Sequence, residues 1–154
     1  MYTVRGRTVA TATTVDTAAA ALWNPHATQR IRVIQFALCA AAAPATGASL
    51  KLRRISARGT PGSTVTPGIA NHSLRALDRP SGALLDLALY TAQPTFEAGD
   101  LGLGWILAAV AAAGVIYPIP GGIEIPPGAG LCITTGAGIA IPASDVVFVW
   151  LEDW

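Results

Sequence analysis

The sequence is short of charged residues. Asp, Glu, Lys and Arg make up 12% of its 154 residues, while apolar residues reach 52%; soluble domains usually carry about 25% charged residues. Much of the apolar fraction is alanine, which buries little surface per residue, so we expect many small, closely packed faces rather than one large core. So few charges leave an isolated monomer poorly solvated. The composition therefore favours a subunit of an assembly.

Basic residues are absent from the second half of the chain. Every Lys and Arg lies at or before Arg79, so residues 1–79 carry 10 − 2 = +8 and residues 80–154, with seven acids, carry −7. The bases are spread over several apolar segments and form no Lys/Arg-rich run interleaved with aromatic residues, so we predict no nucleic-acid partner. We expect basic and acidic strands to meet, within one sandwich or across subunit contacts, where charge fixes register.

Histidine is scarce, which argues against metal and catalytic chemistry. The two histidines, His26 and His72, have no metal-ligand spacing to another His, Cys or carboxylate. His72, Ser73 and Asp78 supply the residue types of a hydrolytic triad, but all three lie in one predicted loop and are better explained as surface polar residues. We therefore predict a protein without enzymatic activity, cofactor or metal.

The two cysteines, Cys39 and Cys132, are far apart in the sequence and lie in apolar surroundings. Unpaired cysteine commonly behaves as a small buried hydrophobic residue. A disulfide between the two is left open by the sequence. The N-terminus lacks a basic-then-apolar leader with a small-residue cleavage site, so we expect cytosolic assembly.

One uncharged stretch, Leu101–Ile123, has the length that a membrane-spanning helix needs. It is interrupted by several glycines and prolines. It is flanked by Asp100 and Glu124, with no Lys or Arg to orient it. A transmembrane helix is therefore the less favoured interpretation, and we predict no membrane partner.

Short apolar segments bounded by Gly or Pro dominate the chain. After an Ala-rich patch, Leu22–His26 predicts a turn, because a proline lies within it. Ile31–Cys39 is apolar on both faces once past Arg32, which suits a central strand between its own core and a neighbour, and Leu50–Ile55 follows it at hairpin spacing. Leu84–Tyr90 favours a strand, with a helix as the alternative. Further predicted strands are Thr3–Thr14, Gly104–Val110, Gly114–Tyr117, Ile123–Ile125, Leu131–Thr135 and Val146–Leu151.

This regular spacing of short strands, with no amphipathic helix among them, is typical of an all-β fold. We predict a single domain over residues 1–154 that forms an antiparallel β-sandwich. Among sandwiches, we favour the jelly roll.

The segment from Gly59 to Gly82 differs from the rest. It repeats a Thr-Pro-Gly turn pattern without a sustained apolar period, which predicts a long loop. Loops longer than about 12–15 residues inside a domain are usually functional or disordered. We expect this loop to contact other subunits, with disorder in isolation as the alternative. The predicted interface, which includes the preceding basic strand, comprises Arg53, Arg54, Arg58, Thr60, Pro61, Val65, Pro67, His72, Arg75 and Arg79.

Four tryptophans allow two interpretations: Trp23, Trp105, Trp150 and Trp154. They form a sugar-stacking platform, or they anchor the core and interfaces, where tryptophan is enriched. We favour anchors, and a carbohydrate-binding β-sandwich remains the alternative function.

The segment Leu22–Val33, LWNPHATQRIRV, resembles a recurring stretch in uncharacterised proteins from phage structural gene clusters. Similar features are the Thr60–Pro67 loop, the Ala92–Thr95 stretch, the Ile123–Leu131 turn and a last strand that ends in Val149–Glu152. The resemblance therefore extends over most of the chain. Its motifs are turn and strand patterns, so it transfers no catalytic or cofactor residue.

This resemblance implies a virion protein with a β-sandwich or jelly roll. The expected role is a capsid decoration or cement subunit that stabilises the particle through protein–protein contacts. Its expected partners are copies of itself, as a trimer, and the major capsid protein or other virion proteins. Its expected location is the virion, after assembly in the host cytoplasm. The alternative is a carbohydrate-binding module of a phage tail or head fibre.

Overall fold

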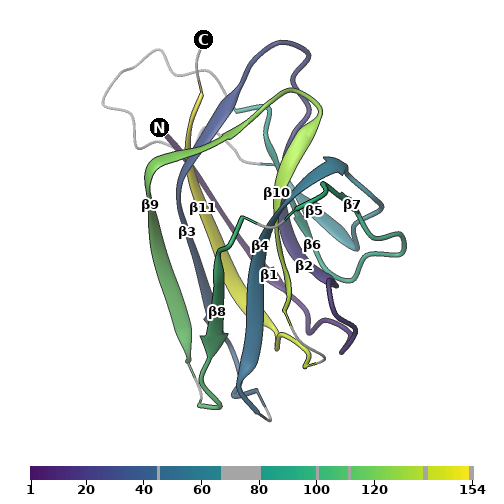
Figure 1. Ribbon diagram of the computed structural model, residues 1–154, viewed down its shortest axis with the longest axis vertical. Coiled ribbons are helices and arrows are strands. Elements are labelled where there is room, and N and C mark those ends of the chain that lie inside the picture. Colours follow the sequence, from purple (N-terminus) through teal and green to yellow (C-terminus); the bar gives the residue numbers. More distant parts are fainter. Residues whose placement is uncertain (45, 67–80, 100, 111, 137–138, 153–154) are drawn as a thin grey trace.

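The computed structural model describes residues 1–44, 46–66, 81–99, 101–110, 112–136 and 139–152, and within these it contains strands and no helix. The strands are β1 (Tyr2–Thr8), β2 (Ala18–Asn24), β3 (Ile31–Ala40), β4 (Ala48–Ala57), β5 (Ser63–Val65), β6 (Leu84–Leu87), β7 (Thr95–Phe96), β8 (Gly104–Leu107), β9 (Gly114–Ile125), β10 (Ala129–Thr135) and β11 (Ser144–Glu152). All strand pairs are antiparallel, and the strands form two sheets that face each other (Figure 1). The predicted antiparallel β-sandwich is confirmed.

The two sheets have different strand orders. Sheet A has the order β1-β11-β3-β9, and sheet B has the order β5-β6-β2-β10-β4-β7, with β8 also paired to β4. From β1 to β4, and again from β8 to β11, successive strands lie in alternate sheets. The chain therefore crosses repeatedly between the two layers, and its strand pairs join segments that are distant in the sequence.

The main core lies between the sheets and is built by alternation, since every second side chain of a strand points to the same face. Sheet A contributes Phe36, Phe148 and Trp150, and all three are fully buried. Sheet B contributes mainly leucines, of which Leu22 and Leu50 are fully buried. The aromatic residues of one sheet thus pack on the aliphatic residues of the other.

Several strand predictions are confirmed. β3 lies between β11 and β9, as the apolar segment Ile31–Cys39 predicted for a central strand. The ambiguous Leu84–Tyr90 segment forms a strand over Leu84–Leu87. The segments predicted near the C-terminus lie within β10 and β11.

Several predictions are wrong. Residues 63–65 of the predicted loop Gly59–Gly82 form the short strand β5, which pairs with β6. The segments Gly114–Tyr117 and Ile123–Ile125, predicted as two strands, belong to the single strand β9. β3 and β4 do not form a hairpin, because they lie in different sheets and β4 pairs with β10, β7 and β8 instead. The Ala-rich patch is a strand, and residues 22–24 of the predicted turn belong to it. β2 lies between β6 and β10 and is covered on both faces, so residues 18–21 are fully buried alanines, which fit where larger side chains would not.

In the part of the chain that the structure describes, no helix is long and apolar enough to span a membrane. The uncharged stretch Leu101–Ile123 instead forms β8 and most of β9.

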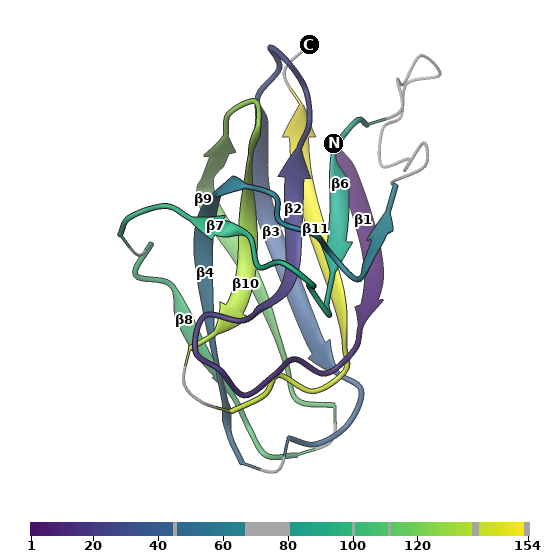
Figure 2. The same cartoon turned by 90° about the vertical axis from the view of Figure 1, so that its right-hand side faces the viewer.

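The chain between β4 and β8 includes two segments that cross the outer face of sheet B. Residues 58–62 and 88–97, which we call the strap, pass in front of this sheet in Figure 2. The backbone of Thr60 pairs with that of Ala92, and the side-chain oxygen of Gln93 accepts a hydrogen bond from the Ala18 backbone at 2.9 Å. The strap and the outer face of sheet B form a second, smaller core between them. It consists of Ala18, Ala21, Ile55, Tyr90 and Cys132, with Trp23 and Phe96 packed against it.

Phe36 offers a test of the main core. Its ring lies 4.9 Å from that of Trp105 and 5.8 Å from that of Tyr117. Truncating a buried phenylalanine leaves a cavity, so we expect Phe36→Ala to lower the free energy of unfolding by about 3–5 kcal/mol in urea denaturation. Gln35→Ala, on the outer face of the same strand, should change it by less than about 0.5 kcal/mol. Equal effects of the two substitutions would contradict this packing.

Candidate functional site

The predicted interface residues divide into two groups. Pro67, His72, Arg75 and Arg79 lie outside the described residues. The other six are Arg53, Arg54, Arg58, Thr60, Pro61 and Val65, and they lie on β4, in the strap or on β5. Each of the three arginines is engaged in contacts within the chain, as set out below. The structure therefore does not gather these six residues on one surface: Arg54 bonds to sheet A and Val65 packs on the main core, and none of the three arginines is unpaired.

Arg58 forms a buried ion pair with Asp86 of β6. The Asp86 side chain is fully buried and accepts two hydrogen bonds of 2.6 Å from Arg58, one to each oxygen. Thr64 of β5 donates a third bond of 2.8 Å to the same carboxylate and accepts one from Arg58. The hydrogen bonds to Asp86 raise the pKa of the Arg58 guanidinium. The network fastens the strap and β5 to sheet B.

Arg53 and Arg54 also serve internal contacts. Arg53 lies 3.0 Å from the Asp16 carboxylate, and its guanidinium stands 4.7 Å above the Phe96 ring of β7. Arg54 donates a 2.6 Å hydrogen bond to the backbone oxygen of Glu124 and so joins β4 of sheet B to β9 of sheet A. Val65 packs against the main core.

The thiol and phenol beneath the strap are not poised for chemistry. Burial raises the pKa of the Cys132 thiol and that of the Tyr90 phenol well above their usual ranges, so both groups stay protonated at neutral pH. A protonated, buried thiol is a poor nucleophile. Cys39 is exposed on sheet A, and both cysteines are free, so the disulfide that the sequence left open is not formed.

The basic first half and the acidic second half meet within one sandwich. Asp145 of β11 pairs with Arg5 and Arg7 of β1, and Glu124 of β9 pairs with Arg30. The Arg58–Asp86 pair follows the same pattern, whereas Arg53–Asp16 lies within the first half. The sequence left open whether basic and acidic strands meet within one sandwich or across subunit contacts, and these ion pairs lie within one sandwich.

The outer face of sheet A is not covered by any described segment. One row of residues across its four strands is Arg5, Val147, Ala37 and Ile116, as the strand register shows. Ile116 is 73% exposed, and Leu151 on β11 is 36% exposed. Here several outward positions of β3 and β11 are apolar, among them Ala37, Val147 and Val149, whereas an antiparallel sheet facing water normally alternates apolar with polar residues.

A hollow of about 520 Å³ lies on this outer face. Its lining includes small residues, among them Ala37 and Gly114, beside larger side chains. The lining residues are Arg5, Ala37, Leu38, Cys39, Ala112, Gly114, Val115, Ile116, Asp145 and Val147. None of them was predicted as a site residue.

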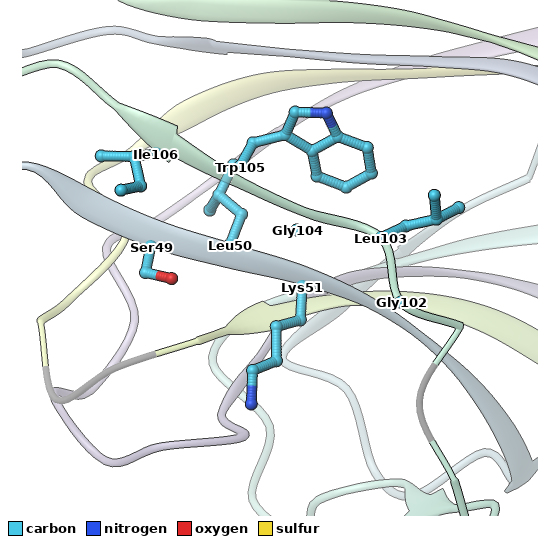
Figure 3. A pocket seen from close by; sticks show the side chains of 8 residues that line it. All are labelled: Ser49, Leu50, Lys51, Gly102, Leu103, Gly104, Trp105 and Ile106. Atoms are coloured by element: carbon cyan, nitrogen blue, oxygen red, sulfur yellow. The ribbon is translucent and has the colours of Figure 1, made fainter.

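A second hollow of about 560 Å³ lies along the β4–β8 pair (Figure 3). Trp105 and Lys51 point to opposite sides of this pair, Trp105 towards the main core. Ile106 is 77% exposed, and Lys51 is the one charged residue among the lining residues. This hollow therefore has little chemistry with which to select a ligand.

A Ser-His-Glu cluster exists, but not with the residues that the sequence suggested. Ser81 donates a hydrogen bond to the Glu152 carboxylate, which also accepts one of 2.9 Å from Trp150 Nε1. His26 Nε2 lies 4.0 Å from the other Glu152 oxygen. Because Ser81 and Glu152 are buried, and because the serine donates to the carboxylate, the arrangement is not that of an activated nucleophile. His72, Ser73 and Asp78 lie outside the described residues, among which no group of three potential metal ligands occurs.

The three tryptophans that the structure describes do not share a surface. Trp150 is fully buried in the main core, Trp105 packs edge-on against Phe36 and Tyr117, and Trp23 belongs to the small core on the other side of sheet B. These positions are those of packing anchors and form no common sugar-stacking platform.

Comparison with known proteins assigns the chain to no family. No protein-family model, no curated protein and no solved structure matches the chain. The function of its two outer faces must therefore be argued from their geometry and chemistry.

The buried ion pair predicts a strong effect at Arg58. Arg58→Met leaves the Asp86 carboxylate buried without its counter-charge, and we expect a loss of about 3–5 kcal/mol in the free energy of unfolding. Adding Asp86→Asn to Arg58→Met removes the uncompensated charge and should recover part of that loss. Urea denaturation of the single and the double variant measures the loss in the free energy of unfolding and its partial recovery. A loss below about 1 kcal/mol for Arg58→Met, or no recovery in the double variant, would contradict the role of this pair.

Asp145 predicts a pH dependence. The hydrogen bond from Arg7 lowers the pKa of Asp145. A lowered folded-state pKa adds stability that is present above the unfolded-state pKa and is lost as the pH falls through the folded-state pKa. Thermal melts should therefore show Asp145→Asn less stable than the wild type at neutral pH and equal to it at strongly acidic pH. A difference between the two that does not change with pH would count against this linkage.

Proposed function

We infer that the sandwich is a jelly roll. When β5, β6 and β7 are set aside, the remaining eight strands, renumbered along the chain, have the order 1-8-3-6 in sheet A and 2-7-4-5 in sheet B. This is the order that two interlocked Greek keys produce in a jelly roll. β5 and β6 then extend sheet B beyond β2, and β7 pairs with β4 as part of an insertion between the fourth and fifth strands.

We propose that the protein is a non-enzymatic structural subunit of a phage virion, a capsid decoration or cement protein that stabilises the particle through protein–protein contacts. Jelly rolls recur in viral capsid proteins and in lectins, so the fold alone does not choose a function. The resemblance of several segments to proteins of phage structural gene clusters supports the virion setting. Its partners are copies of itself, as a trimer, and the major capsid protein.

The observation that carries this proposal is the uncovered apolar face of sheet A. Val147 and Val149 of β11 and Ala37 of β3 point outward on it, beside the exposed Ile116 of β9. Sheet B, by contrast, has its outer face covered by the strap, which completes a second core. Exposed apolar patches on soluble proteins mark interaction sites. A neighbouring protein on sheet A would play the part that the strap plays on sheet B.

The chemistry of the described residues fits a structural role. The buried thiol and phenol are held protonated, and the Ser-His-Glu cluster is buried with its serine bonded to the carboxylate. Of the predicted interface, Arg53, Arg54 and Arg58 form contacts within the chain. What remains available to a partner is surface shape and charge.

Assembly is the test of this function. Light scattering on the purified chain should give three times the monomer mass of 15.7 kDa. The chain should also sediment with capsids made by the gene cluster that encodes it. Leu151→Lys, on the sheet A face, should weaken capsid binding, whereas Lys51→Glu on sheet B should not. A stable monomer that does not bind these capsids would refute the proposal.

A further inference from the structure

The outer face of sheet A has a charge balance that selects its partner. We propose that this face binds a protein segment in which acidic and apolar residues are interleaved, with a carboxylate of the partner on Arg5 and a neighbouring apolar side chain in the hollow. The inference rests on the proposed function in one respect, because it takes the occupant to be a neighbouring protein of the particle.

The hollow is shaped for an apolar side chain. Two adjacent cross-strand rows form it, and one of them places Val147, Ala37 and Ile116 side by side on β11, β3 and β9. In the next row Cys39 lies opposite Gly114, so the lining of the hollow combines small residues with larger ones. Its volume of about 520 Å³ lies within the range of pockets that receive ligands or side chains.

Arg5 is the available cation at the rim of this hollow. Arg7 holds both oxygens of Asp145, with bonds of 2.9 Å from Nε and 2.8 Å from its terminal nitrogen. Arg5 reaches the same carboxylate only at 3.4 Å, and its side chain is 70% exposed. A carboxylate of a partner that approaches the hollow therefore meets an arginine whose hydrogen-bonding capacity is largely unused.

The far end of the face carries the same excess of positive charge. Arg30 pairs with Glu124 on β9, and Arg32 lies opposite Glu124 in the register of β3 and β9. Together with Arg5, Arg7 and Asp145, the described residues at the two ends of the face include four arginines and two carboxylates, 4 − 2 = +2. The apolar centre thus lies between two ends that each have one arginine in excess.

This balance favours an acidic partner over a second copy of the chain related by a two-fold axis. In a two-fold contact the same patch occurs on both subunits, so the +2 face would meet another +2 face. Like charges placed across an interface are unfavourable, whereas opposite charges steer the encounter. Pairing through the edge of sheet A at β9 is also hindered, because Pro118 and Pro120 lie within that strand and have no N–H to donate. The sheet's face, rather than this edge, is the docking surface.

A peptide probe tests the inference on the full chain. The probe is a fluorescein-labelled peptide of alternating Leu and Glu, and its control has Lys in place of each Glu. We expect the acidic peptide to bind in fluorescence anisotropy and to shift the NMR signals of Ala37, Val147 and Ile116. The Lys peptide should not bind.

Three variants locate the binding. Arg5→Glu should weaken the acidic peptide about tenfold or more, because an attractive contact becomes repulsive, and Arg5→Gln should weaken it less. Ala37→Leu fills the hollow and should also weaken binding. The matched control is Lys51→Glu, which makes the same charge reversal on sheet B and should leave the affinity unchanged.

The inference is overturned if the acidic peptide does not bind, or if Lys51→Glu weakens it as much as Arg5→Glu. It is also overturned if Arg5→Glu dissociates an oligomer of the chain, which would make a second copy the occupant. Binding to vesicles of phosphatidylcholine and phosphatidylserine that Arg5→Glu abolishes, without peptide binding, would make a lipid surface the occupant. If capsids bind the wild type and Arg5→Glu equally well, the inference fails while the proposed function stands. If the chain binds the peptide but neither assembles nor binds capsids, the proposed function fails while the binding of an acidic segment stands.

Discussion

The carboxylate of Asp86 is fully buried on the outer face of sheet B, and a buried charge is costly unless a counter-charge and hydrogen bonds satisfy it. Arg58 supplies both from the strap. The strap is thereby fixed over Ala21 and Cys132, and the outer face of sheet B becomes interior. The two faces of the sandwich are made unequal by this one interaction. The unequal faces, in turn, are the reason why we propose sheet A as the side for a partner.

Much of the fold follows from local sequence patterns, because strand character is expressed within a few residues. The continuous apolar run of β3 predicted a central strand, and the Gly and Pro boundaries predicted most of the later ones. Strand pairing is different. β3 and β4 are adjacent in the sequence but lie in different sheets, and nothing local distinguishes a hairpin from a crossover. The alanines of β2 were missed as a strand because alanine has low strand propensity, and only burial on both faces explains it there.

The candidate site was harder to predict than the fold. Arg53, Arg54 and Arg58 were chosen as interface residues because they are basic and precede a long loop, yet their partners Asp16, Asp86 and the Glu124 backbone become neighbours only through folding. The sequence does contain a signal for the apolar outer face of sheet A. β3 and β11 are apolar at successive positions, which is more than one buried face requires, and that excess indicates a second covered face. Locating the hollow needed the register of four strands.

Pro118 and Pro120 near the edge of sheet A matter most where many copies lie close together. Subunits arrayed on a particle experience a high local concentration, and an open sheet edge under those conditions is a template for continuous cross-strand growth from one molecule to the next. Each proline removes a hydrogen-bond donor from β9, so a row of subunits cannot readily merge through this edge into one extended sheet. In the virion role that we propose, the particle would then gain a dense coat whose subunits stay separate, and the same residues would oppose fibre formation during expression at high yield.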